Sequence, residues 1–334
     1  MGRILWCGPL ATSPPDDVIA WSGFPPRPFH APALAAGLDI VPVASFEKFK
    51  DEMSISSALP RLAFVYSLEP WHLMAMMLYC KRIPFVLYYQ NSWPRFLNIP
   101  KRLAAWLALR MSRLVLLQDG LCVHHFSSLI KPEKTLFFPW FVDERLFDPL
   151  LVTSSAIQTE PWLFVPGDRA RLDHVVIAIA KRIPIKILRV SRYFAPGVLE
   201  AYSQCPNVQV RHFVPWTDLR DLYASASVVL NVVDDRYNSA GMTTFLEALA
   251  MNARVITPAN HSSCGFAFAD GFKPYRTVDR PDDVDAWISQ IPSALRDGPV
   301  HPDRSPRRLA VEMAGFDACA ARWSEVFMRS LSPR

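Results

Sequence analysis

The chain has 334 residues, of which 51% are hydrophobic and 20% charged, and its formal net charge is +5. This apolar content excludes a disordered chain, and the length is that of two α/β domains of ordinary size. Six cysteines stand far apart without a CxxC pair, which excludes the disulfide framework of a small secreted module and indicates reduced thiols. No run of about 18 uncharged apolar residues occurs, so no membrane-spanning helix is expected.

The first residues, MGRILWCGPL, carry one arginine before a short apolar run, and a proline-rich stretch without a cleavage pattern follows. This pattern predicts a β-strand and not a signal peptide. We therefore expect a cytoplasmic protein, with association at the inner face of a membrane as an open alternative.

Along the first half, apolar runs typical of buried parallel strands alternate with helical patterns. The expected strands are ILWC, DIVPVA, LAFVYS, PFVLYY, RLVLLQ and KTLFF, and the expected helices are 31–36, 70–81, 101–111 and 121–129. The sequence turns polar and small at 151–158, so we expect the first domain to be residues 1–152.

The second half repeats the alternation. The expected strands are WLFVP, IKILRV, VQVRHF, SVVLNVV and ARVITP, and the expected helices are 172–182, 198–203, 217–224 and 242–251. This predicts a second parallel sheet in a domain of residues 153–310, with ligands bound beyond the carboxyl ends of its strands. Two further helices are expected at 282–295 and 306–331, and residues 311–334 are expected to pack back toward the first domain.

Basic residues gather in one part of the first domain. Between Pro70 and Leu117 the chain carries seven Lys or Arg and no Asp or Glu, interleaved with aromatic and leucine side chains that include Trp93 and Trp106. A basic helix with aromatic anchors is attracted to anionic lipid, so residues 81–113 predict peripheral contact with an anionic membrane. An ordinary domain helix with a basic outer face fits the pattern slightly better. No recognition motif accompanies the charge, so no nucleic-acid partner is expected.

The most informative segment for chemistry runs from Asn231 to Pro258. A buried strand ends at Val233, a polar loop follows, and Gly241 permits close backbone approach where a helix begins at Met242 to Thr244. The helix N-terminus offers free N–H groups that hold a diphosphate without a metal ion, and the hydroxyls of Thr243 and Thr244 add donors. Glu247 can accept two hydrogen bonds from a ribose diol. A buried amphipathic helix with a polar N-cap fits the segment equally well.

The segment SAGMTTFLEALAMNARVI resembles the donor-binding signature of the family-4-like GT-B glycosyltransferases (glycosyl transferases group 1), in which a glycine-rich turn enters a helix reading LEAMA before a strand reading PVI. Members usually carry a second Glu eight residues before the ribose-binding one, and here Ser239 stands at that place. The resemblance implies that Gly241, Met242, Thr243, Thr244 and Glu247 bind the donor. It places Ser239 beside the transferred sugar.

Three further segments resemble the same family in the same order. PWFVDERLFDP, at 139–149, is similar to the N-G-V-D-x-x-x-F-x-P passage that closes the first domain. FVPGDRARLDH, at 164–174, resembles the glycine turn whose basic residues reach the donor phosphates, which implies donor-binding roles for Gly167, Arg169, Arg171 and Asp173. Surface charge is the alternative for the two arginines. WSGFPPRPFHAPAL, at 21–34, resembles the loop after the first strand, with Gly23 lining the cleft.

The family carries a histidine near the reaction centre at the end of the fourth strand, where this chain has Gln90. A neutral amide orients a sugar hydroxyl but cannot take a proton, so acid–base roles do not transfer from the family. Stabilisation of the leaving phosphate then carries much of the catalysis, and Gln90, Ser239 and Arg171 are the expected catalytic residues.

The resemblance implies an α/β protein of the GT-B fold, with two Rossmann-like domains, each with a parallel sheet, that face each other across a cleft. It implies a metal-independent, hexosyltransferase-like enzyme of the kind found in polysaccharide biosynthesis, retaining as the family is, although inversion stays open as the other stereochemical outcome. The donor would be a UDP- or GDP-linked sugar, the acceptor a glycan, a lipid-linked sugar or a small molecule, and no further cofactor is expected. Two alternatives stay open: a catalytically silent nucleotide-sugar-binding or accessory protein, and a sugar-nucleotide epimerase. The motifs of dehydrogenases, P-loop NTPases and serine hydrolases are lacking.

Overall fold

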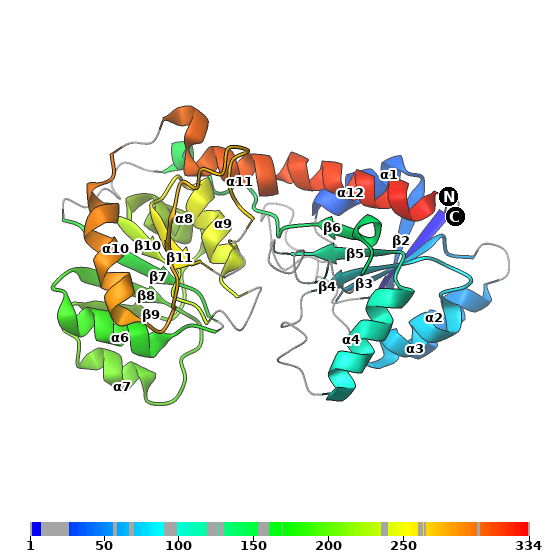
Figure 1. The fold of residues 1–334 in the computed structure, drawn as a ribbon, viewed down its shortest axis with the longest axis horizontal. Coiled ribbons are helices and arrows are strands. Elements are labelled where there is room, and N and C mark those ends of the chain that lie inside the picture. Colours follow the sequence, from blue (N-terminus) through cyan, green and yellow to red (C-terminus); the bar gives the residue numbers. More distant parts are fainter. Residues whose placement is uncertain are drawn as a thin grey trace. The chain divides into compact units, whose positions relative to one another are not determined.

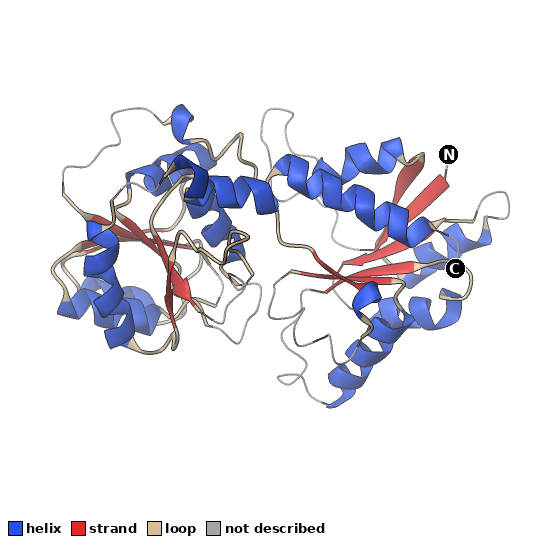
Figure 2. Ribbon diagram, turned by 45° about the horizontal axis from the view of Figure 1, so that its top comes forward, coloured by secondary structure: helices blue, strands red, loops and turns tan. Residues whose placement is uncertain are grey.

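A computed structural model describes most of the chain, and Figures 1 and 2 show its fold. The described residues are 2–7, 27–55, 59–66, 70–89, 99–118, 126, 130–152, 160–168, 170–234, 240–259, 263, 265–298 and 301–332. They fall into two compact units, one formed by Met1–Pro139 with Phe316–Arg334 and the other by Trp140–Gly315. Each unit contains a six-stranded parallel sheet, which confirms the predicted α/β class.

The sheet of the first unit has the order β2-β1-β3-β4-β5-β6. Its strands are β1 (Gly2–Cys7), β2 (Leu38–Val43), β3 (Leu62–Tyr66), β4 (Phe85–Tyr89), β5 (Leu114–Leu117) and β6 (Thr135–Phe137). All six expected strands are present. Every residue of β5 is buried, as expected for a strand covered on both faces of a parallel sheet.

Five helices cover the described part of this sheet: α1 (Arg27–Ala35), α2 (Phe46–Ser54), α3 (Pro70–Tyr79), α4 (Ile99–Met111) and α12 (Phe316–Leu331). Helix α2 was not predicted, because its sequence FEKFKDEMS buries few side chains. Its first turn is capped by Ser45, whose Oγ accepts from Lys48 N, and Glu52 pairs with Arg3 of β1 at 2.6 Å. Most of the helix expected at 121–129 lies outside the described residues.

Aromatic side chains fill the space between this sheet and the helices α1 and α12, which lie side by side in Figure 1. Trp6 of β1 stacks on Phe64 of β3 with ring centroids 4.5 Å apart. Trp323 of α12 packs edge-on against Phe29 of α1 at 4.7 Å and in a tilted arrangement against Phe138 at 4.6 Å. Helix α12 therefore completes the core of the first unit, although it follows the whole second unit in sequence.

The sheet of the second unit has the order β12-β11-β10-β7-β8-β9. Its strands are β7 (Trp162–Pro166), β8 (Lys186–Val190), β9 (Val208–Arg211), β10 (Val228–Leu230), β11 (Val255–Pro258) and β12 (Arg276–Val278). The described helices are α6 (Asp173–Arg182), α7 (Val198–Ser203), α8 (Trp216–Ser225), α9 (Met242–Ala250), α10 (Val284–Arg296) and α11 (Pro306–Ala314). The short edge strand β12 was not predicted, because its three residues carry no periodic pattern.

The units divide the chain at Pro139 and Gly315, whereas the expected boundaries were 152/153 and 310/311. Contacts explain why residues 140–152 lie with the second unit. Val142 N donates to Ala314 O at 2.8 Å, and Nη1 of Arg307 in α11 donates to Phe147 O at 2.7 Å. The segment at 139–149 that was expected to close the first domain thus packs almost wholly with the second.

The helix expected at 306–331 is two helices, because α11 ends at Ala314 and Gly315 caps it. Gly315 N still donates to Val311 O at 3.0 Å, but its extended ψ of 170° turns the chain out of the helix. A Cβ at this position would lie 2.6 Å from Val311 O, so glycine permits the tight exit. None of the helices in the described part of the chain has the length and apolar character of a membrane span.

Candidate functional site

The second sheet has a topological switch point between β7 and β10. Numbered within the unit, its strand order is 3-2-1-4-5-6, so the chain leaves β7 toward one edge and β10 toward the other. Ligands of open parallel sheets bind in the crevice that such a reversal opens beyond the carboxyl ends of the strands. The segments that follow β7 and β10 are the two that the sequence analysis selected.

These two segments are joined by backbone hydrogen bonds. Leu172 N donates to Val232 O at 3.2 Å, and Asp234 N donates to Ala170 O at 2.9 Å. Arg171 and Val233 form an antiparallel bridge between them. The chain after β7 is therefore fixed against the end of β10 before it enters α6.

Arg171 lies at the centre of this arrangement. Its Nη1 donates to Asn231 Oδ1 at 2.6 Å, and its Nη2 donates to Thr244 Oγ1, in the first turn of α9, at 2.7 Å. A Cβ at Gly167 would collide with the guanidinium, so the glycine turn is shaped around this side chain. Burial and the nearby charge of Arg189 lower the pKa of Arg171 to about 9, which still leaves it protonated at pH 7. Both guanidinium hydrogen bonds go to neutral side chains.

The entry into α9 requires glycine on two counts. Gly241 is the N-cap with φ +75°, which disfavours any residue with a side chain. A Cβ there would also lie 2.5 Å from Asn231 Oδ1 and 2.9 Å from Val233 Cγ1. Gly241 and Thr243 are half-buried, whereas Met242 is buried. The first N–H groups of a helix have no partner within it, so this end of α9 offers donors beside Arg171.

Glu247, one turn further along α9, is buried and 2% exposed. Its Oε2 accepts from the hydroxyl of Tyr223 in α8 at 2.8 Å, and its Oε1 is buried without a hydrogen-bond partner. Burial raises the pKa of Glu247 to about 8, against the hydrogen bond from Tyr223 and the charge of Arg171. The ribose role of Glu247 stays a prediction, and Tyr223 is a partner that the sequence pattern did not indicate.

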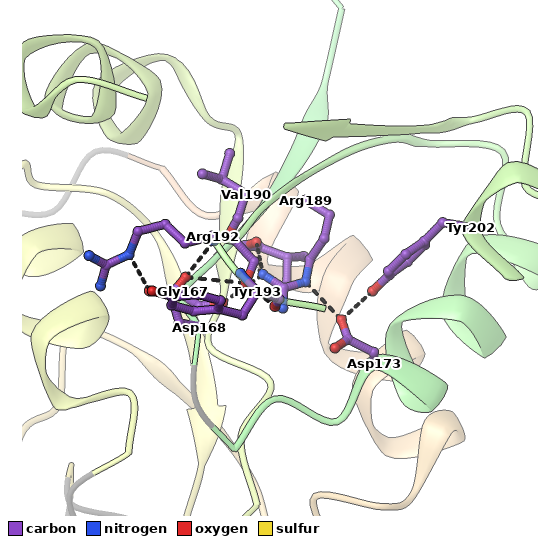
Figure 3. A network of polar contacts seen from close by, with 10 residues as sticks. Gly167, Asp168, Asp173, Arg189, Val190, Arg192, Tyr193 and Tyr202 are labelled. Atoms are coloured by element: carbon purple, nitrogen blue, oxygen red, sulfur yellow. Dashed lines mark hydrogen bonds and ion pairs between the residues drawn. The ribbon is translucent and has the colours of Figure 1, made fainter. Parts of the chain in front are cut away.

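Asp173 lies in a buried network under the glycine turn, shown in Figure 3. At the start of α6 it accepts from Arg189 Nε at 2.8 Å and from the hydroxyl of Tyr202 at 2.6 Å. Arg189, fully buried on β8, also donates through Nη1 to the carbonyl oxygens of Gly167 and Val190, each at 2.7 Å. Asp173 therefore fixes the position of Arg189 through an ion pair, and Arg189 fixes the backbone of the Gly167 turn through hydrogen bonds.

Asp168 closes the other side of the turn. Its carboxylate accepts from Arg192 N and Nε, each at 2.7 Å, and from Ser191 Oγ at 3.2 Å. Burial alone would raise the pKa of Asp168, but the hydrogen bonds and charge of Arg192 lower it. The ends of β7 and β8 are therefore joined by an ion pair at the same edge of the sheet.

The structure brings together many of the residues that sequence analysis selected, with Asn231 between them. Arg171 contacts the Gly167 turn, Asn231 and Thr244, and Asn231 in turn lies against Gly241 and donates through Nδ2 to Thr257 Oγ1 on β11 at 3.1 Å. The expected residues Gly23, Gln90, Arg169 and Ser239 lie outside the described residues.

Among the site residues that were not selected from the sequence, two left a signal there. Asn231 is polar within the buried run VVLNVV, and Arg189 is charged within the strand KILRV. A buried polar side chain in an apolar strand is unusual unless it is hydrogen-bonded, so both positions indicated an internal polar contact.

No family model matches the chain, and no curated protein matches it in sequence. Solved structures do match. Sucrose-phosphate synthase from Thermosynechococcus elongatus has a TM-score of 0.73 at 15% identity, over 98% of this chain and 99% of that one. HepE from Anabaena, in complex with UDP and glucose, has a TM-score of 0.64 at 12% identity, over 98% and 100%. UDP-GlcNAc 2-epimerase from Neisseria meningitidis, bound to UDP-GlcNAc, has a TM-score of 0.56 at 12% identity, over 98% and 100%.

At such identities a likeness in structure speaks for the fold and not for the activity. The chain has the two-domain α/β fold of the GT-B glycosyltransferases, as its sequence predicted.

Proposed function

We propose that the protein is a glycosyltransferase that binds a nucleotide diphosphosugar at the switch point of the second sheet and transfers the sugar to an acceptor. The observation that carries this proposal is Arg171, whose charge lies between the Gly167 turn and the first turn of α9 and is hydrogen-bonded to the neutral side chains of Asn231 and Thr244. A guanidinium and a helix N-terminus together favour a diphosphate.

The neighbouring strand ends favour a nucleotide over a simple phosphate. Tyr193 and Phe213 follow β8 and β9 and are 71% and 69% exposed, so each presents an aromatic ring to solvent at the carboxyl edge of the sheet. A base stacks on such a face. Oε1 of Glu247 is buried without a hydrogen-bond partner, and a ribose hydroxyl that reached it would donate the missing hydrogen bond.

The chemistry needs no enzymic base. When the bond between the anomeric carbon and the diphosphate oxygen breaks, the electron pair stays on the leaving diphosphate, where Arg171 and the positive end of α9 stabilise it. The acceptor hydroxyl forms the new bond, and its proton passes to the departing phosphate oxygen. This route gives retention of configuration and requires no metal ion.

The likeness to HepE in complex with UDP and to an epimerase bound to UDP-GlcNAc supports a UDP-linked donor. The second of these also keeps a sugar-nucleotide epimerase as the alternative function. An epimerase changes its donor when no acceptor is present, whereas a transferase consumes the donor in proportion to the acceptor. A catalytically silent protein binds the nucleotide and turns nothing over.

The test is calorimetric titration with UDP, GDP, ADP, TDP and CMP in the absence of divalent metal. We expect one nucleotide to bind and Arg171→Met to weaken it at least tenfold, which corresponds to about 1.4 kcal/mol. Arg182→Met is the matched control, because Arg182 pairs with Asp285 on the surface of the same unit. Binding of none of the nucleotides by the wild-type protein contradicts the proposal. If the protein converts the corresponding nucleotide sugar when no acceptor is present, it is an epimerase and not a transferase.

A further inference from the structure

Helices α3 and α4 of the first unit each turn an apolar stripe toward solvent. On α3 the stripe is Met74, Met77 and Leu78, which are 42%, 58% and 61% exposed. Their spacing of three and four residues places them on one face of the helix. On α4 the stripe is Ile99, Leu103 and Trp106, which are 80%, 56% and 38% exposed and recur every three or four residues.

The two stripes belong to one region, because α3 and α4 pack against each other. Helix α3, PWHLMAMMLY, carries no Asp, Glu, Lys or Arg and also buries Ala75 and Met76 against the core. A helix that is apolar all round is ordinarily buried on every side. Exposed apolar side chains gathered on two neighbouring helices are typical of an interaction surface. We call these six side chains the α3–α4 surface.

Positive charge accompanies this surface. Lys81 and Arg82 follow α3, and Arg110 lies one turn beyond Trp106 with its guanidinium 4.4 Å from the centre of the indole ring. Within the described part of the chain, none of these three side chains has an acidic partner. The sequence from Pro70 to Leu117 contains no acidic residue at all.

We propose that the α3–α4 surface docks on an anionic lipid bilayer. Apolar stripes with an indole at one end enter the acyl boundary, while lysine and arginine side chains reach the phosphate layer. A second copy of the chain is a poorer occupant, because a two-fold contact would bring the same uncompensated positive charges together. The α3–α4 surface belongs to the first unit, whereas the proposed nucleotide site belongs to the second. The inference does not depend on the proposed activity.

The experiment is co-sedimentation of the full chain with vesicles of phosphatidylcholine alone and of phosphatidylcholine mixed with phosphatidylglycerol. We expect binding to the anionic vesicles that falls as salt is raised. The double variant Ile99→Ser/Leu103→Ser is expected to lose it. Arg82→Gln and Arg110→Gln are each expected to weaken it about fivefold.

Matched controls lie on the second unit. Leu150→Ser and Leu199→Ser remove exposed apolar side chains that are 90% and 42% accessible, and both should leave vesicle binding unchanged. Equal binding to both kinds of vesicle, or equal loss in the control variants, overturns the proposal. Sedimentation velocity without vesicles supplies the other outcome: a dimer that Ile99→Ser/Leu103→Ser dissociates assigns the surface to self-association. Nucleotide titration of the same variants reports separately on the proposed function.

Discussion

The two sheets of this protein share a parallel design but differ in where they bury polar groups. In the first unit, the face under α1 and α12 is filled by rings, among them Trp6, Phe64 and Trp323. In the second unit, the carboxyl edge of the sheet buries Arg189, Asn231, Glu247 and Thr257. The described residues of the first unit show no comparable cluster of buried charge.

A parallel topology alone does not determine where polar groups are buried. A parallel sheet with flanking helices needs apolar strands, and both units supply them. Burial of a charge is unfavourable unless it is paired, so a chain that buries Arg189 and Glu247 at a switch point does so at some loss of stability. Polar groups placed there are typical of a binding site, and the all-aromatic cluster of the first unit is typical of a structural core.

The largest effect should come from the aromatic cluster. Trp323→Ala removes a side chain that is 2% exposed and contacts rings of α1, β3 and the segment after β6, and it should lower the free energy of unfolding by about 4 kcal/mol. Met328→Ala on the same helix, at a position 66% exposed, should change it by less than about 0.5 kcal/mol. Urea denaturation followed by circular dichroism measures the free energy of unfolding of both variants. An equal loss in the two would show that the aromatic cluster does not stabilise the fold.

The next effect concerns the buried ion pair of the second unit. Arg189→Met removes the charged partner of Asp173 and the guanidinium donor to the carbonyl oxygens of Gly167 and Val190, and it should cost about 3 kcal/mol. Arg182→Met breaks an exposed pair and should cost at most about 1 kcal/mol. If denaturation gives the two variants the same stability, the network under the Gly167 turn does not hold that turn.

Two glycines with nearly equal φ allow the cost of the left-handed conformation to be measured apart from the cost of a steric collision. Gly197 and Gly241 are helix N-caps at +78° and +75°, but a Cβ at Gly197 would meet nothing within 4 Å. Gly197→Ala should cost about 1 kcal/mol for the left-handed conformation. Gly241→Ala should cost about 2 kcal/mol more, because it also collides with Asn231 and Val233. Thermal unfolding of the two variants measures this difference. Equal destabilisation by both would mean that a Cβ at Gly241 fits beside Asn231.

Taken per pH unit, the smallest effect is the slope that Glu247 gives to the pH dependence of the free energy of unfolding. Its pKa is raised from 4.5 when unfolded to about 8 in the folded protein, so the folded state binds the proton more tightly. The stability that this proton confers is complete below pH 4.5 and is lost as pH rises to about 8. The loss is at most about 1.4 kcal/mol per pH unit. Glu247→Gln should flatten this part of the curve in urea denaturation at several pH values, and an unchanged slope would show that Glu247 is not its source.

Much of the fold could be predicted because the strands of both sheets are short apolar runs separated by turn residues. Helix α2 was not predicted because most of its residues are polar, and it is stabilised by the Ser45 cap, the Arg3–Glu52 pair and the burial of Phe49 and Met53. The end of the helix at Gly315 was not predicted, because α11 and α12 are both amphipathic and only this one residue separates them. Packing, which places α11 and α12 in different units, decided the boundary.

The site could be predicted in part. The glycines and the start of α9 follow from local pattern, whereas the contact of Arg171 with Asn231 and Thr244 joins positions 60 and 73 residues apart. Only the adjacency of β7 and β10 creates it. The same holds for Tyr223 and Glu247, which lie on different helices and are brought together by packing of α8 on α9.

The return of α12 to the first unit has a consequence for synthesis. A ribosome adds about 5–20 residues per second, so Phe29 and Phe64 emerge roughly 13–60 s before Trp323 and Phe327 can cover them. The second unit is continuous in sequence and can close during that interval. For the same interval, the aromatic face of the first unit is the stretch of nascent chain that a chaperone selective for apolar segments has to shield.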